Sequence, residues 1–168
     1  MAADVILNTT YDDIYREVRA FLLGLFRLEG ERVIRGYSNN APLPQSPFIL
    51  MNIIHEQALS TNTHDYSLDE QNTEVMQSME VQMQIDFYGA TSGQMARQFC
   101  TLWRDFYACE RLQCCQPLYC DDPKYLPFTN EANEYEERFM VTAHLTYNPL
   151  IVHDQDFITN PSITLQHL

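Results

Sequence analysis

The sequence predicts a single α+β domain over residues 1–168, in which a mainly antiparallel sheet of about four or five strands carries two helices on one face. Three observations predict this class. Apolar residues recur with a helical period after Thr10. They alternate with polar residues over 79–87, and directly after that stretch their period becomes helical again. They alternate with polar residues once more over 138–147. The predicted order is therefore helix, strand, strand, helix, strand, strand.

The first predicted helix covers about residues 10–29. Thr10 is a favoured N-cap residue, and Asp12 and Asp13 follow in the first turn, where carboxylates stabilise the positive end of a helix. Gly30 predicts the end of the helix. A helix lying on a membrane surface is the alternative, but the polar face carries acidic as well as basic residues, which disfavours it. The apolar stripe consists of Ile14, Val18, Phe21, Leu22 and Leu25.

Two strands and their connections follow the first helix. Residues 36–47 hold three prolines and predict a stiff, extended loop. The apolar run at 48–57 predicts a strand that is buried on both faces. The polar and acidic residues 59–73 predict a long hairpin loop, which leads to the half-polar strand at 79–87.

The second predicted helix begins directly after that strand. Gly89 ends the alternation, and Thr91 or Ser92 is positioned to cap the helix, with Gln94 completing a capping box. The apolar stripe of this helix is expected to contain Met95, Phe99, Leu102, Trp103 and Phe106.

The last third of the chain supplies the remaining strands. A short strand is predicted around residues 118–119, inside a turn-rich stretch. The alternation over 138–147 predicts a longer strand that Pro149 ends. Residues 154–168 alternate too weakly for an assignment, and we interpret them as an extended arm.

Composition and charge exclude several classes of function. The chain has 10 Lys and Arg against 23 Asp and Glu, a net charge of −13, which argues against binding nucleic acid through its phosphates. The longest apolar run, at 48–51, is far too short to span a membrane. The N-terminus has no basic segment followed by an apolar core, so we expect no signal peptide and synthesis in a cytoplasm.

No pattern of catalytic or metal-ligating residues stands out, and we predict a protein that is not an enzyme and has no cofactor or metal. The common nucleophile, phosphate-binding and zinc-protease motifs are missing from the sequence. The five cysteines are an odd number, which indicates reduced thiols, and the adjacent Cys114 and Cys115 are a poor pattern for a shared ion. A small cytoplasmic enzyme that uses a Cys–His pair remains the alternative of another class, because such pairs meet only in space.

A stripe of arginines on the second predicted helix is the strongest candidate for a binding surface. Arg97, Arg104 and Arg111 recur every seven residues, opposite the apolar stripe, and none has an acidic residue three or four positions away. Such a stripe on an acidic protein indicates contact with an acidic surface of a partner, although a solvated arginine face is the plainer interpretation. The candidate acidic residues for that contact are Glu80, Asp86, Asp65, Asp69 and Glu70.

Four stretches of the chain resemble the neck or tail terminator proteins of tailed bacteriophages. They are "VIRGYSNNAPLPQSPFILM" (33–51), "VQMQIDFYGATSGQMARQF" (81–99), "QPLYCDDPKYLPFTNEANEYEERF" (116–139) and "HLTYNPLIVHDQDF" (144–157). The resemblance implies a structural virion protein that forms a six-fold ring, caps the finished tail tube and ends its polymerisation. A head–tail stopper or a tail-completion protein is the alternative within the virion.

The same resemblance implies the partners and the location. The partners are further copies of the chain in a homo-hexamer, the tail tube protein and the head–tail connector or stopper protein. Double-stranded DNA passes through the lumen without specific binding, and no membrane is involved. The protein is expected in the tail or neck of the virion, after assembly in the host bacterial cytoplasm.

Overall fold

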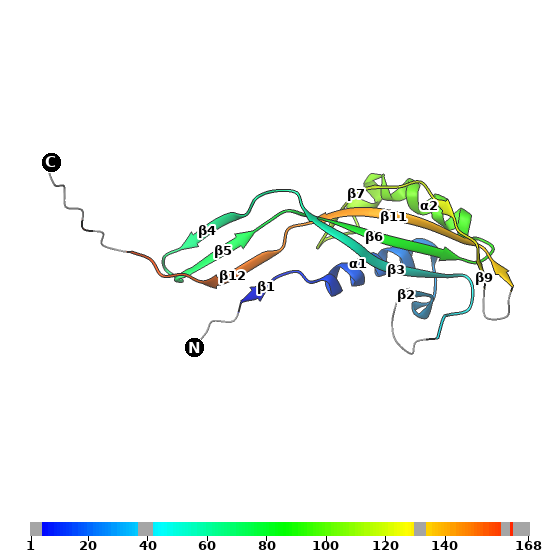
Figure 1. Ribbon diagram of the computed structural model, residues 1–168, viewed down its shortest axis with the longest axis horizontal. Coiled ribbons are helices and arrows are strands. Elements are labelled where there is room, and N and C mark those ends of the chain that lie inside the picture. Colours follow the sequence, from blue (N-terminus) through cyan, green and yellow to red (C-terminus); the bar gives the residue numbers. More distant parts are fainter. Residues whose placement is uncertain (1–4, 37–41, 130–133, 159–161, 163–168) are drawn as a thin grey trace.

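The chain forms an elongated molecule with a helix-bearing body and a narrow arm that extends from it (Figure 1). A computed structural model describes residues 5–36, 42–129, 134–158 and 162. The architecture is α+β, with a six-stranded sheet in the body and a four-stranded sheet in the arm. Both sheets together exceed the four or five strands that the alternation predicts, because several strands are too short to show a period.

Helix α1 (Tyr11–Phe26) begins where the sequence indicates. The Thr10 side chain accepts a hydrogen bond from the Asp13 amide, and the Asp13 carboxylate accepts one from the Thr10 amide 2.9 Å away, which completes a capping box. The helix ends before the predicted Gly30, because Arg27 adopts a left-handed conformation with φ of 52°. A short 3-10 turn, η1 (Gly30–Arg32), then leads into β2 (Val33–Arg35).

The body sheet has the order β2-β3-β6-β11-β7, and β8 also pairs with β11. Only β2 and β3 are parallel, and the other neighbours are antiparallel. The strands that follow β2 are β3 (Phe48–Ala58), β6 (Met79–Tyr88), β7 (Gln116–Cys120), β8 (Lys124–Tyr125) and β11 (Arg138–Tyr147). A separate two-stranded hairpin joins β9 (Phe128–Thr129) to β10 (Tyr135–Glu136).

A single apolar core joins the sheet to α1 and to α2 (Ser92–Trp103). The ring of Phe87 on β6 lies 5.9 Å from that of Phe26 on α1 and 5.8 Å from that of Phe99 on α2. The ring centroid of Phe21 on α1 lies 6.3 Å from that of Phe99 and 5.8 Å from that of Trp103, and both ring pairs pack edge to face. The apolar face of β6, as the alternation predicts, is part of this core.

The second helix is shorter than its apolar period predicts. Helix α2 ends at Trp103, and the Asp105 side chain accepts a hydrogen bond from the Tyr107 amide and starts the four-residue helix α3 (Phe106–Cys109). Phe106, predicted in the core, is 70% exposed. The predicted capping box at Thr91 is also wrong, because its hydroxyl points to the Met95 sulfur 3.6 Å away and caps no amide. The Asp105 cap interrupts a period that the apolar residues alone would continue.

The predicted loop at 59–73 contains a β-hairpin instead. Strands β4 (Thr63–Ser67) and β5 (Asn72–Met76) lie beyond the ends of β3 and β6, and together with two terminal strands they form the arm. The arm has the order β1-β12-β5-β4, in which β1 is Ile6–Leu7 and β12 is Leu150–Asp154. Asp154, the first residue of the segment 154–168 that we interpret as an extended C-terminal arm, is the last residue of β12. Residues 159–161 and 163–168 of that segment lie outside the described residues.

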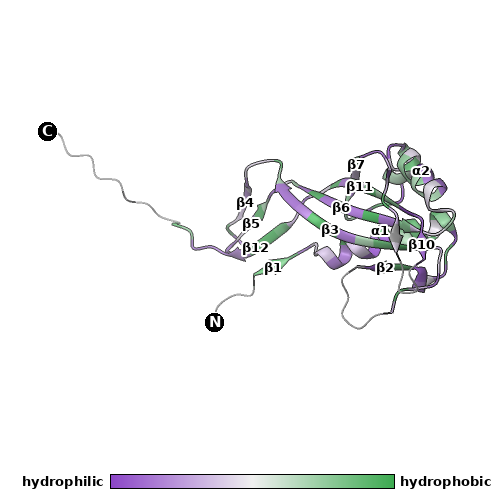
Figure 2. Cartoon of the chain, turned by 45° about the vertical axis from the view of Figure 1, so that its right-hand side comes forward, coloured by the Kyte–Doolittle hydropathy of each residue, from purple (hydrophilic) through white to green (hydrophobic). Residues whose placement is uncertain are grey.

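The junction between arm and body is polar. In Figure 2 the part of β3 that leads toward the arm is mostly hydrophilic. Its Glu56 carboxylate accepts hydrogen bonds from Tyr11 at the start of α1 and Tyr147 at the end of β11. One carboxylate thus links β3, α1 and β11 by hydrogen bonds at the point where the arm leaves the body. None of the helices in the described part of the chain is long and apolar enough to cross a bilayer.

Candidate subunit-contact surface

The polar side chains of β6 form two closed networks with neighbouring strands. In the first, the Glu80 carboxylate lies 2.6 Å from His144 Nδ1 on β11 and accepts a hydrogen bond from the Gln57 amide at 3.1 Å. The Tyr119 ring stacks on His144 with 4.0 Å between centroids. Glu80 and His144 are each only 6% exposed. Hydrogen bonds from His144 and then from Gln57 lower the pKa of Glu80.

This network predicts a loss of stability in acid. Because folding lowers the pKa of Glu80, the network stabilises the fold above the ordinary glutamate value of 4.5 and loses this contribution as the pH falls through the folded pKa. Urea unfolding of wild type and Glu80→Gln, at neutral pH and near pH 4, measures the effect. Wild type should lose more free energy of unfolding on acidification than Glu80→Gln, whereas the control Glu31→Gln, at an exposed glutamate, should behave as wild type. Equal losses in all three proteins would contradict the prediction.

The second network surrounds Asp86. Arg138 on β11 holds the Asp86 carboxylate at 2.9 and 3.0 Å, and Gln84 donates to it at 2.6 Å. Asp86 is 2% exposed. Glu80 and Asp86 are therefore paired within the chain and buried, which corrects the expectation of an open acidic strand face. The cause is pairing across strands, which the sequence of one strand cannot reveal.

The three predicted arginines do not form one stripe, because the helix breaks at Asp105. Arg104 donates to the Cys120 carbonyl and lies 3.3 Å from the Asp122 carboxylate. The Arg111 guanidinium lies over the Tyr107 ring, 3.4 Å from its centroid. Only Arg97 keeps the expected character, since it is exposed and has no ion pair or hydrogen bond from its guanidinium within the described residues.

A second arginine, missed in the sequence, shares this character. Arg27 follows α1, is exposed, and likewise has no guanidinium partner among residues that the structure describes. It lines a groove of about 310 Å³ between the end of α1 and the start of α2. Gln94 lines the opposite wall, and Arg97 is three residues further along the same side of α2. The remaining lining residues are largely apolar or amide: Leu25, Phe26, Leu28, Pro47, Thr91, Met95 and Gln98.

The acidic residues of the predicted loop lie on the arm. Asp65 on β4 is directly opposite Glu74 on β5, and Asp69 and Glu70 follow in the turn between these strands. All four are exposed, and within the described chain none forms a salt bridge with a basic residue. Like charges directly opposite each other destabilise a strand pair. Glu74 joins the candidate residues only through this register, which the sequence does not reveal.

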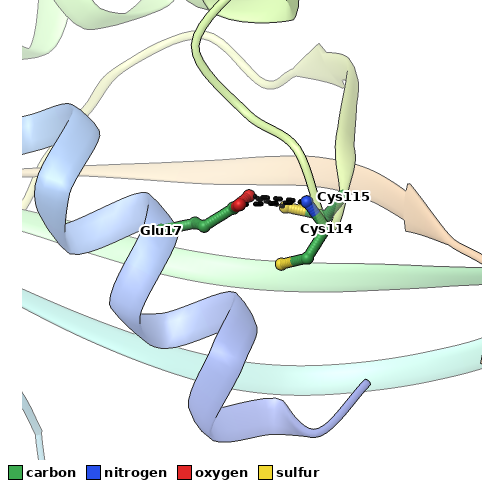
Figure 3. A group of neighbouring side chains, drawn as sticks. All are labelled: Glu17, Cys114 and Cys115. Atoms are coloured by element: carbon green, nitrogen blue, oxygen red, sulfur yellow. Dashed lines mark hydrogen bonds between the residues drawn. The ribbon is translucent and has the colours of Figure 1, made fainter. Parts of the chain in front are cut away.

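One further cluster combines a carboxylate with two thiols. Glu17 of α1 accepts a hydrogen bond from the backbone amide of Gln113 at 2.8 Å. It accepts another from the backbone amide of Cys114 at 3.0 Å, and its Oε2 lies 3.9 Å from Cys115 Sγ (Figure 3). Burial is the main cause that raises the pKa of Cys114 to about 11, and it also raises that of Cys115. Both thiols are therefore protonated at neutral pH.

The enzyme alternative required a cysteine beside a histidine. In the described residues no cysteine sulfur forms a hydrogen bond with a histidine ring, and the buried His144 has Glu80 and Tyr119 as its partners.

The comparison with protein families confirms the resemblance that the four stretches indicate. The chain matches the family described as phage neck terminator protein over residues 12–167, nearly its whole length. No curated protein matches it. This family is one of structural proteins of the phage neck, and the match therefore favours a structural component of the virion over the enzyme alternative. On this match the chain belongs to the phage neck terminator protein family.

Proposed function

We propose that this neck terminator assembles into a closed six-fold ring that caps the tail tube, ends tube polymerisation and joins the tail to the head connector. The observation that carries the proposal is the placement of two complementary patches toward opposite ends of the elongated molecule. The acidic arm patch comprises Asp65, Asp69, Glu70 and Glu74, and the groove patch comprises Arg27, Arg97 and the groove between α1 and α2.

The two patches cannot neutralise each other within one copy. The β4–β5 end of the arm and α2 lie at opposite ends of the elongated molecule (Figure 1). Contact between an arm patch and the groove patch of the next copy joins two different surfaces, and repeating that contact by rotation closes a ring. Arg104 and Arg111 have no part in this contact, because partners in their own chain already engage them.

The charge of the protein also suits the passage of DNA. With a net charge of −13, a ring of this chain repels the phosphate backbone, so DNA moves through the lumen without adhering. The ring assembles in the host cytoplasm and engages the tail tube protein on one side and the connector or stopper protein on the other. A head–tail stopper, the alternative within the virion, would bind the connector but would not cap isolated tail tubes.

The test reverses the charges of each patch. Arg27→Glu/Arg97→Glu and Asp65→Lys/Glu74→Lys should each remain folded, since exposed substitutions typically change stability by within about 0.5 kcal/mol. Each should assemble poorly, because like charges then meet at every repeated contact. Combining both pairs of substitutions in one chain should restore the ring. Arg16→Glu, at an exposed arginine outside the groove, is the matched control and should assemble normally.

Light scattering and negative-stain images, with purified tail tubes present, measure ring formation and capping at low and high salt. Thermal melting of each variant establishes that it is folded. Normal rings from both reversed variants would refute the contact between the patches. A wild-type protein that leaves tubes uncapped, and stays monomeric beside them, would refute the terminator function itself.

A further inference from the structure

We propose that Glu17, Cys114 and Cys115 form a binding site for a thiophilic divalent cation such as Zn²⁺, with one carboxylate oxygen and both sulfur atoms as ligands. The donor atoms of the three residues all lie within 4.8 Å of one another. Figure 3 shows them converging from two segments, the middle of α1 and the bend before β7. The site is independent of the ring contact, because none of its residues belongs to the arm or groove patch.

Adjacent cysteines are a poor pattern for a shared ion, but the local backbone of Cys114 and Cys115 removes this objection. In a strand, successive side chains point to opposite faces, so neighbouring cysteines cannot share an ion. Residues 113–115 are bends rather than a strand, and β7 begins only at Gln116. The sulfur atoms of Cys114 and Cys115 therefore both lie within 4.8 Å of the same Glu17 carboxylate oxygen. Glu17 is nearly 100 residues away in sequence, so a search for ligand spacing does not find it.

The carboxylate is fixed in place before any ion arrives. Gln113 and Cys114 hold it through their amides, and these hydrogen bonds leave lone pairs on the carboxylate oxygens for a cation. Zinc binds sulfur at about 2.3 Å and carboxylate oxygen at about 2.0–2.2 Å, so the ligands of one ion lie roughly 3.5–3.8 Å apart. A contraction of the cluster by about 1 Å, within reach of side-chain rotation, satisfies this geometry.

The donor set selects the class of ion. Thiolate sulfur favours zinc and softer metals, whereas magnesium and calcium take oxygen ligands. Binding displaces one proton from each thiol to solvent, as is general for cysteine sites. Cys114 and Cys115 also line a hollow of about 300 Å³ together with Asn8, Thr9 and Asn148, and a water molecule in it is the candidate fourth ligand.

The experiment uses the full chain in its reduced form, stripped of metal by a chelator. Titration with Zn²⁺ alone, against a chromophoric competitor, should give one ion per chain. Co²⁺ should produce the charge-transfer absorption that requires thiolate ligands. Cys114→Ser and Cys115→Ser should each weaken binding by at least about tenfold and reduce that absorption, as expected when a metal ligand is removed. Cys109→Ser, at a cysteine outside the cluster, is the matched control and should bind as wild type.

Glu17→Gln should weaken Zn²⁺ binding while the thiolate absorption of bound Co²⁺ persists, which separates the role of the carboxylate from that of the sulfurs. If this variant does not fold, the two cysteine variants decide the question alone. Zn²⁺ should raise the melting temperature of wild type but not of Cys114→Ser/Cys115→Ser. No thiolate absorption in wild type, or absorption and affinity unchanged in both single cysteine variants, would overturn the site.

Discussion

Replacing Phe99 with alanine is expected to lower the free energy of unfolding by about 3–5 kcal/mol, the usual cost of emptying a buried aromatic position. Phe99 is fully buried, at 0% exposure. Its ring lies 5.8 Å from that of Phe87 on β6, 6.3 Å from that of Phe21 on α1 and 5.1 Å from that of Trp103. Its loss leaves a cavity at the point where both helices meet the sheet.

Phe106 offers a matched control of the same residue type on the same stretch of chain. It belongs to the apolar stripe that the sequence predicts, yet it is 70% exposed. Phe106→Ala should therefore change the free energy of unfolding by within about 0.5 kcal/mol. Urea unfolding followed by circular dichroism and by the fluorescence of Trp103 measures both variants. Similar losses at the two positions would mean that α2 continues through Asp105 as one buried helix.

Replacing Arg138 with alanine should have an effect of similar size for a different reason. The substitution leaves the Asp86 carboxylate, which is 2% exposed, without its ionic partner. Removing one member of a buried ion pair typically costs about 3–5 kcal/mol, because the remaining charge stays buried. Arg138 itself is partly exposed, with 24% of its side chain accessible, so we expect the lower end of that range.

The double variant Asp86→Asn/Arg138→Ala separates burial of a charge from loss of packing. It should recover part of the lost stability, since the buried group is then neutral. Arg16→Ala is the control for an exposed pair, because Arg16 is 76% exposed beside Asp13, and its cost should be within about 1 kcal/mol. If Arg138→Ala costs no more than Arg16→Ala in urea unfolding, Asp86 is accessible to solvent and remains a candidate contact residue.

The long elements of the body follow from the sequence alone. A strand whose side chains alternate for ten residues, as in β6 and β11, can bury only one face in the core, so period and burial agree. Thr10 and Asp13 mark the start of α1 because they satisfy amides that no earlier residue can reach. The family, too, is readable from the quoted stretches, and the match over residues 12–167 confirms it.

The remaining features depend on contacts between distant segments. The arm hairpin forms from polar residues because β5 also pairs with β12, a strand far along the chain, and propensity along 59–73 does not reveal that partner. The opposition of Asp65 and Glu74 follows from strand register, and the pairing of Asp86 with Arg138 follows from a neighbouring strand.

The cluster of Glu17 with Cys114 and Cys115 also depends on contacts between segments that are distant in sequence. The sequence determined the residue types and their local periods, because backbone geometry repeats along the chain. Only the tertiary structure decided which charges and thiols meet, because hydrogen bonds, ion pairs and ligand distances join atoms that are close in space, whatever their separation along the chain.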